Sequence, residues 1–279
     1  MATRQFEPMS VGQILDAAIW IYRRNFVRFV VIASIVQVPL AVVSVVVTRI
    51  VQSAIVTTPE AQFETGFAVR MAESLVTLFV AIMGEAIAKA ALVTTVSESY
   101  LGREMTAMES FRLVLSRAGA VIAAGLLVAL LVAIGTLVFI VPGILLALWL
   151  ALTIPAVMLE RRGPVGAMRR SRWLLAGNLG KIFVLSVVVF LMGLILWSSI
   201  ALGGRLLSEY VAGGNEMASV VITHLARLIA SILALPIGAG AATLLYYDLR
   251  IRKEGLDLEM LVPTLGAEGE TSPSATAGQ

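Results

Sequence analysis

The sequence predicts an all-α integral membrane protein with six transmembrane helices in three hairpins, each preceded by a short cytoplasmic amphipathic helix lying in the membrane plane. Three observations predict this fold. The 279 residues are 59% hydrophobic and 14% charged, whereas soluble domains average about 45–50% apolar and about 25% charged residues. Six apolar stretches follow one another, most of them about 20 residues long, which is the length that crosses a bilayer. The lysines and arginines gather in alternate connections between these stretches.

The first element is an amphipathic helix that begins at Val11. Ser10 and Gln13 form the S-x-x-Q pattern of a capping box, which satisfies free N–H groups at a helix start. One helical face is apolar through Val11, Ile14, Leu15, Ala18, Ile21 and Tyr22. With Trp20 at its edge, this helix suits the headgroup boundary of a bilayer. The alternative is that the segment is the polar end of the first span, but the break at Asn25 favours a separate helix.

The first half of the chain alternates apolar spans with polar connections. The spans cover about 29–50, 74–96 and 118–140, and the connections cover 52–70 and 97–117. Pro39 predicts a kink in the first span. In the second connection, Thr106 and Glu109 form another capping box, and a second amphipathic helix follows with Phe111 and Val114 on its apolar face.

The second half begins with a tight turn at Pro142 and Gly143, the typical residues of a turn. Its spans cover about 144–159, 182–202 and 217–247, and its connections cover 160–181 and 203–216. Pro164 can open a third amphipathic helix, because proline is tolerated at the first helical position. Pro155 lies near the end of the short fourth span, and Pro236 interrupts the last one.

The distribution of basic residues predicts the orientation. Of the 21 lysines and arginines, 16 lie in the N-terminal region, the 97–117 and 160–181 connections and the start of the tail. The connections 52–70 and 203–216 contain only Arg70 and Arg205. Because positive residues are retained on the cytoplasmic side, we expect both termini and all three amphipathic helices there, in a bacterial inner membrane.

An internal repeat organises the chain into one polytopic helical membrane domain, 1–260. A shift of 153 residues aligns Trp20 with Trp173 and Arg28 with Lys181, and a shift of 93 residues aligns Ile14 with Ala107. The repeats cover about 10–97, 104–160 and 164–250, and each comprises an amphipathic helix and two spans. The alternative is that any helix followed by a span looks alike. Residues 261–279 are rich in small and polar residues and are predicted to be disordered.

Three segments carry a resemblance to a known family: VGQILDAAIWIYRRNF at 11–26, PGILLALWLALTIPAVMLERRGPVGAMRRSRWLLAGNLGKIF at 142–183, and YYDLRIRKEGLDLE at 246–259. They resemble the membrane domain attached to some bacterial glycerophosphoryl diester phosphodiesterases, and its stand-alone relatives of unknown function. The resemblance covers most of residues 8–260 and rests on topology and packing motifs. The printed sequence ends soon after the third segment, so we expect no catalytic barrel of the kind found in the two-domain relatives, and the resemblance leads us to expect no catalysis.

Four ionisable residues inside the spans are candidates for an intramembrane polar site. Glu85 and Lys89 lie four apart on one face of the second span, and His224 and Arg227 lie three apart in the sixth. An ionisable side chain in a span is costly unless it is paired or hydrated, so it suggests function. The alternatives are that Glu85 and Lys89 form a pair that joins helices, and that Arg227 extends to the membrane surface.

The basic residues of the first and third amphipathic helices are candidate contacts for anionic phospholipid headgroups. They are Arg23, Arg24, Arg28, Arg161, Arg162, Arg169, Arg170, Arg172 and Lys181. The alternative is that these residues only set the topology.

The composition excludes several functions. The absence of cysteine excludes disulfides and thiolate metal sites, and a single histidine excludes a histidine-based metal cluster. No phosphate-binding loop, nucleophile elbow or H-E-x-x-H pattern is present, and we expect no cofactor and no catalytic residue. The formal net charge of +3 is too small to indicate nucleic-acid binding. We therefore predict a non-enzymatic protein whose partner is the lipid bilayer, with homo-oligomers or membrane-protein partners left open. The alternative is a small secondary transporter or channel with a polar site between the second and sixth spans.

Overall fold

The computed structural model describes residues 8–54, 64–212 and 216–255, and all regular structure in these ranges is helical. The described helices are α1 (Val11–Arg24), α2 (Phe26–Ala54), α3 (Glu64–Tyr100), α4 (Ala107–Leu115), α5 (Ala118–Val138), α6 (Ile140–Leu150), α7 (Thr153–Leu159), α8 (Pro164–Leu175), α9 (Leu179–Ala212) and α10 (Glu216–Glu254). The predicted disordered tail, 261–279, and much of the polar connection 52–70 lie outside the described residues.

Six helical segments of the described chain are long and apolar enough to cross a membrane. They are Phe26–Val51, Phe67–Tyr100, Ala118–Val138, Ile140–Leu159, Leu179–Val211 and Val221–Glu254. Much of their apolar surface faces outward, since only 11% of the most apolar stretch of α9 is buried. Such a surface needs lipid as its solvent. The predicted class, an all-α multi-pass membrane protein, is confirmed.

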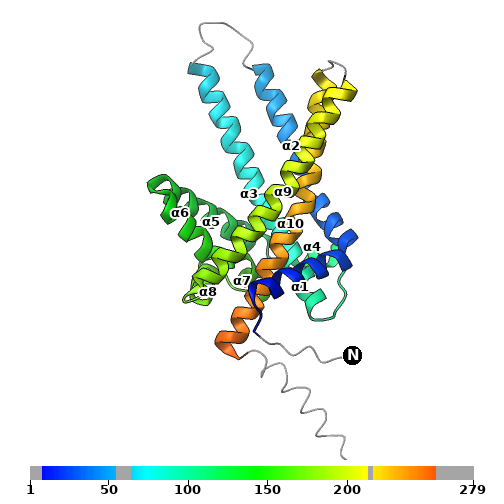
Figure 1. Cartoon of the computed structure of the whole chain (residues 1–279). Coiled ribbons are helices and arrows are strands. Elements are labelled where there is room, and N and C mark those ends of the chain that lie inside the picture. Colours follow the sequence, from blue (N-terminus) through cyan, green and yellow to red (C-terminus); the bar gives the residue numbers. More distant parts are fainter. Residues whose placement is uncertain (1–7, 55–63, 213–215, 256–279) are drawn as a thin grey trace, which may run out of the picture.

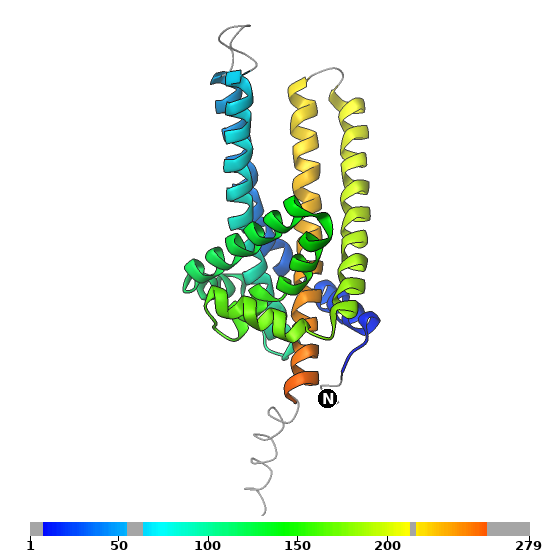
Figure 2. The ribbon, with the colours of Figure 1, turned by 90° about the vertical axis from the view of Figure 1, so that its left-hand side faces the viewer.

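Two long helix pairs rise from one common end of the molecule. α2 packs on α3 and α9 packs on α10, and both pairs extend away from the end where α1 lies (Figures 1 and 2). α5 packs on α6, and this third pair lies lower (Figure 1). α1 and α8 run across the lower ends of the long helices (Figures 1 and 2). We call this end the foot: it comprises α1, α4, α7, α8 and the C-terminal parts of α3 and α10.

The buried core is concentrated in the foot. Leu92 and Val96 of α3, and Leu244, Tyr246 and Leu249 of α10, are almost completely buried. In the upper parts of the long helices, large apolar side chains are exposed instead, as in 75–79 and 190–197. Packing between protein side chains therefore stabilises the foot, while the upper helices expose apolar side chains suited to lipid.

The amphipathic helices form where the sequence predicts them, but their apolar faces pack on protein. The capping boxes at Ser10 and Thr106 both form. In α1, Ile14, Ala18 and Ile21 are buried, and α1 packs mainly against α10. The expected contact of this apolar face with the headgroup boundary is therefore corrected: protein covers it, and Trp20 at its edge stays exposed. That these helices lie in the membrane plane remains a prediction, as do the three repeats.

The fourth predicted span differs in detail from the structure. The turn lies at Phe139, and Pro142 falls in the first turn of α6, where a proline displaces no helical hydrogen bond. A break at Ala151 and Leu152 separates α6 from α7. Ser171 of α8 repairs the break, because its Oγ donates to the carbonyl of Trp149 at 2.7 Å and accepts from the N–H of Leu152 at 3.1 Å. Pro155 consequently lies in the first turn of α7.

Candidate functional site

Two of the four intramembrane candidates, Glu85 and Lys89, form an ion pair on α3. Lys89 Nζ lies 2.8 Å from Glu85 Oε1, and the two side chains are 45% and 51% exposed. The pair therefore lies on the outward surface of α3. His224 and Arg227 are exposed on α10. No group of acidic residues or histidine suited to a metal ion occurs among the described residues.

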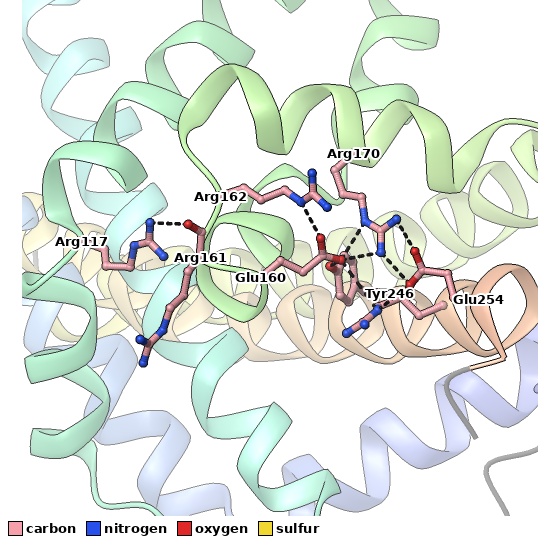
Figure 3. A network of polar contacts seen from close by, with 8 residues as sticks. Arg117, Glu160, Arg161, Arg162, Arg170, Tyr246 and Glu254 are labelled. Carbon is pink, nitrogen blue, oxygen red and sulfur yellow. Dashed lines mark hydrogen bonds and ion pairs between the residues drawn. The ribbon is translucent and has the colours of Figure 1, made fainter. Parts of the chain in front are cut away.

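The main polar cluster of the foot surrounds Glu160, the residue that follows α7. Arg162 Nε and Arg170 Nε donate to its two carboxylate oxygens at 2.6 and 2.7 Å, and Tyr246 of α10 donates to it as well. Arg170 also pairs with Glu254 at 2.5 Å, and Figure 3 shows this network joining α8 to α10. We call these residues the Glu160 network.

Burial and hydrogen bonding act in opposite directions on the charges of this network. Burial alone disfavours the ionised carboxylate of Glu160, but hydrogen bonds from Tyr246, Arg170 and Arg162 more than offset this and lower its pKa. Burial likewise opposes the charge of Arg170, whereas Glu254 and Glu160 favour it and raise its pKa. Both residues are therefore held in their charged forms.

A second cluster surrounds Asp248, which is completely buried. The backbone N–H of Met9 donates to Asp248 Oδ1 at 2.6 Å, Lys181 donates to Oδ2, and Arg252 Nε lies 3.1 Å from Oδ2. Lys181 also donates to the carbonyl of Met9 at 2.6 Å. This cluster fastens the segment before α1 to the start of α9 and the end of α10.

These clusters change the set of candidate lipid contacts. The side chain of Arg170 is only 9% exposed, and that of Lys181 is 15% exposed. Both bind carboxylates inside the protein, so the prediction that they contact lipid headgroups is corrected. Arg162 and Arg28 are more exposed but pair with Glu160 and Glu104. The remaining candidates are exposed and have no carboxylate partner among the described residues: Arg23, Arg24, Arg161, Arg169 and Arg172. Two of them stack on tryptophans, Arg24 on Trp20 at 5.2 Å and Arg172 on Trp149 at 5.1 Å.

The foot also contains a cleft of about 630 Å³, a volume typical of ligand pockets. Its walls come from α3, α4 and the segment between them, the segment before α5, the end of α7 with the segment that follows it, and α10. Four arginines and one glutamate carry its charge: Arg103, Arg117, Arg161, Arg250 and Glu98. Sequence reasoning identified only Arg161 of these as a candidate. The positive-inside pattern placed the others on the cytoplasmic side, but nothing in their spacing predicts that they share a cleft.

No protein-family model matches the chain, and neither a curated protein nor a solved structure matches it. The resemblance to the membrane domain of glycerophosphoryl diester phosphodiesterases therefore stays a proposal. The six apolar helices and the chemistry of the foot carry the functional argument.

Proposed function

We propose that this chain is a non-enzymatic, multi-pass protein of a bacterial inner membrane whose cytoplasmic foot contacts anionic phospholipid headgroups. One observation carries the proposal: the foot of a bundle of apolar helices carries exposed arginines that have no carboxylate partner among the described residues. Arg23 and Arg24 end α1, and Arg169 and Arg172 lie on α8. An anionic leaflet attracts each such residue by about 1 kcal/mol. Trp20 and Trp173, which are 45% and 47% exposed, suit the same interface because their rings are amphipathic.

Fluorescence quenching by brominated lipids tests the proposal. The protein is reconstituted in mixed phosphatidylcholine and phosphatidylglycerol bilayers, in which one or the other lipid carries bromine. We expect brominated phosphatidylglycerol to quench Trp20 and Trp173 more strongly than brominated phosphatidylcholine does. The combined variant R23Q, R24Q, R169Q and R172Q should lose this excess, whereas the control R70Q and R205Q, in the opposite connections, should keep it. Equal quenching by the two lipids in the unchanged protein would overturn the proposal.

A secondary transporter or channel with a polar site between the second and sixth spans remains the alternative. It needs Glu85 and Lys89 to serve a solute rather than each other. If they form only a structural pair, the double variant E85Q and K89M should fold normally, while E85Q alone should be less stable because it leaves Lys89 unpaired in lipid. Solute flux into liposomes that the unchanged protein supports and the double variant abolishes would favour the transporter.

A further inference from the structure

We infer that the arginine cleft of the foot binds a phosphate group, carried either by an anionic phospholipid headgroup or by a soluble phosphorylated molecule. This inference rests on the proposed function, since it assigns one specific binding site to the anionic ligands of the foot. The shared chemistry is a phosphate oxyanion, which planar guanidinium groups bind through paired hydrogen bonds.

The charges of the cleft are only partly neutralised by the protein. Arg103 pairs with Glu98 at 2.7 Å, and Arg250 pairs with Glu254 at 3.0 Å. Arg117 and Arg161 have no carboxylate partner among the described residues. Two guanidinium groups, one from the segment before α5 and one from the segment after α7, therefore contribute uncompensated positive charge to one concave site.

Arg117 has a buried donor that the described residues leave unused. Its Nη2 donates to the carbonyl of Arg161 at 2.7 Å, as Figure 3 shows. Its Nη1 is buried and has no hydrogen-bond partner among the described residues. Leaving a buried charged donor without an acceptor is costly. Because Nη1 is enclosed in this conformation, a phosphate oxygen reaches it only when the guanidinium turns toward the cleft.

The backbone at Arg161 turns the chain at the end of α7. Arg161 has a φ of +53°, and it alone has a positive φ among the described residues other than glycine. An arginine gains nothing from this left-handed conformation, which is unfavourable for a residue with a Cβ atom. Arg161 follows Glu160, the C-cap of α7, and helices commonly end with a left-handed residue at this position. Here it directs the carbonyl of Arg161 toward Arg117 and leaves the Arg161 guanidinium at the cleft.

The rest of the lining suits an amphiphilic ligand. Leu101, Met105 and Leu113 form apolar wall next to the arginines, and the cleft lies in the foot, where the apolar helices end. A phospholipid could place its phosphate on Arg117 and Arg161 and its glycerol region on this wall. A soluble phosphate ester would use the arginines alone.

Thermal unfolding and calorimetry of the full chain in neutral detergent distinguish the two sources. The probes are inorganic phosphate, glycerol 1-phosphate and phosphatidylglycerol, with sodium chloride matched for ionic strength. Stabilisation by phosphatidylglycerol alone identifies the lipid as the source, and stabilisation by all three identifies the phosphate group itself. If none of the probes shifts the unfolding temperature beyond the chloride control, the inference is overturned.

Variants at the two unpaired arginines test the site itself. Arg117→Gln and Arg161→Gly should each weaken binding of the effective probe about tenfold, the effect of one lost charge-assisted hydrogen bond. Arg161→Gly is the sharper variant because glycine relieves the positive φ, so it should unfold at a higher temperature while binding less. The matched control is Arg112→Gln on α4, which is exposed and outside the cleft, and it should bind within about twofold of the unchanged protein.

Different results would refute phosphate binding in the cleft and the proposed contact of the foot with lipid headgroups. Unchanged binding by Arg161→Gly and Arg117→Gln, with excess quenching that the four surface arginines still control, would refute the cleft and leave the lipid-contacting foot intact. Loss of binding in the control Arg112→Gln as well would show a diffuse electrostatic effect and would also refute the cleft.

Discussion

At the scale of single residues, the foot depends on a carboxylate that water does not reach. Asp248 is completely buried, and the side chain of its cationic partner Lys181 is 15% exposed. A buried carboxylate is tolerated only when it is paired and hydrogen-bonded, and removing one member of a buried pair leaves the other uncompensated. Because Asp248 also accepts from the backbone of Met9, one side chain joins three separate parts of the sequence.

Replacing Asp248 by alanine should therefore destabilise the protein strongly. We expect a loss of about 3–5 kcal/mol in the free energy of unfolding, the usual cost of breaking a buried ion pair. Titration with denaturing detergent, followed by circular dichroism, measures it. Glu104→Ala is the control: Glu104 also pairs with an arginine, at 2.8 Å, but its side chain is 78% exposed, so little change is expected. Equal losses in the two variants would contradict this account.

The Glu160 network should make stability depend on acid pH. The pKa of Glu160 is lower in the folded protein than its ordinary value, which is about 4.3 in an unfolded chain. The stabilisation is therefore fully present above that value and is lost as the pH falls through the lowered folded pKa.

The unfolding temperature should consequently fall as the pH is lowered from about 6 to about 3. Glu160→Gln should be less stable at pH 6 but should show a shallower pH dependence. The pKa values of Glu104 and Glu109 are also lowered in the folded protein, so they too lower the unfolding temperature at acid pH. Both residues are unchanged in Glu160→Gln, so the difference between the pH dependences of the two proteins reports the contribution of Glu160. Identical slopes in the two proteins would exclude Glu160 as a source of the acid sensitivity.

At the scale of helices, local signals predicted where elements begin but not what they touch. The capping boxes at Ser10 and Thr106 and the proline opening α8 are determined by a few neighbouring residues, so the sequence predicted these starts correctly. The break between α6 and α7 depends on Ser171, about 20 residues away in the chain, and local sequence contains no sign of it. Amphipathicity alone cannot distinguish a bilayer from a neighbouring helix. The sequence therefore predicts lipid against the apolar face of α1, where the structure has α10.

The pair formed by α5 and α6 has an unusual tip. Residues 137–141, Leu-Val-Phe-Ile-Val, are exposed and wholly apolar. The backbone N–H of Phe139 donates to the carbonyl of Gly135 at 3.0 Å. In hydrocarbon, backbone polar groups need such hydrogen bonds within the protein. α6 alone has 11 residues, so it is about 16 Å long, roughly half of a hydrocarbon core. The break at Ala151 and Leu152 separates it from α7, which completes the apolar segment Ile140–Leu159. Figure 1 shows this tip well below the outer ends of the two long pairs.

We therefore predict that the tip of α5 and α6 lies within the hydrocarbon rather than in water. The chain has no cysteine, so single-cysteine variants report accessibility directly. Phe139→Cys should resist a membrane-impermeant maleimide added to either side of the membrane. Glu60→Cys, in the polar connection 52–70, should react from outside, and Glu104→Cys should react from the cytoplasmic side. Rapid labelling of Phe139→Cys from outside would instead show that α5 and α6 cross the membrane completely.

At the scale of the whole molecule, the sequence predicts a lipid environment and six apolar helices, whereas the arginine cleft depends on long-range packing. The arginines of the cleft come from positions 103, 117, 161 and 250, four segments that only the fold brings together. The sequence also cannot show which arginines are neutralised. Arg170 and Arg161 belong to one basic connection, yet the first is enclosed by Glu160 and Glu254 and the second has no carboxylate partner among the described residues.

The orientation of the molecule follows from the same charge asymmetry and makes the last prediction. The Glu160 network, the Asp248 cluster and the arginine cleft all lie in the foot, so one end of the bundle contains most of the basic residues. Positive residues near span ends are retained in the cytoplasm, which predicts a cytoplasmic foot. Alkaline phosphatase inserted in 52–70 or 203–216 should be active, and a fluorescent protein at the C-terminus or inserted after Gly163 should fluoresce. Fusions that place 52–70 and 160–181 in the same compartment would invalidate both this orientation and the proposed contact of the foot with cytoplasmic lipid headgroups.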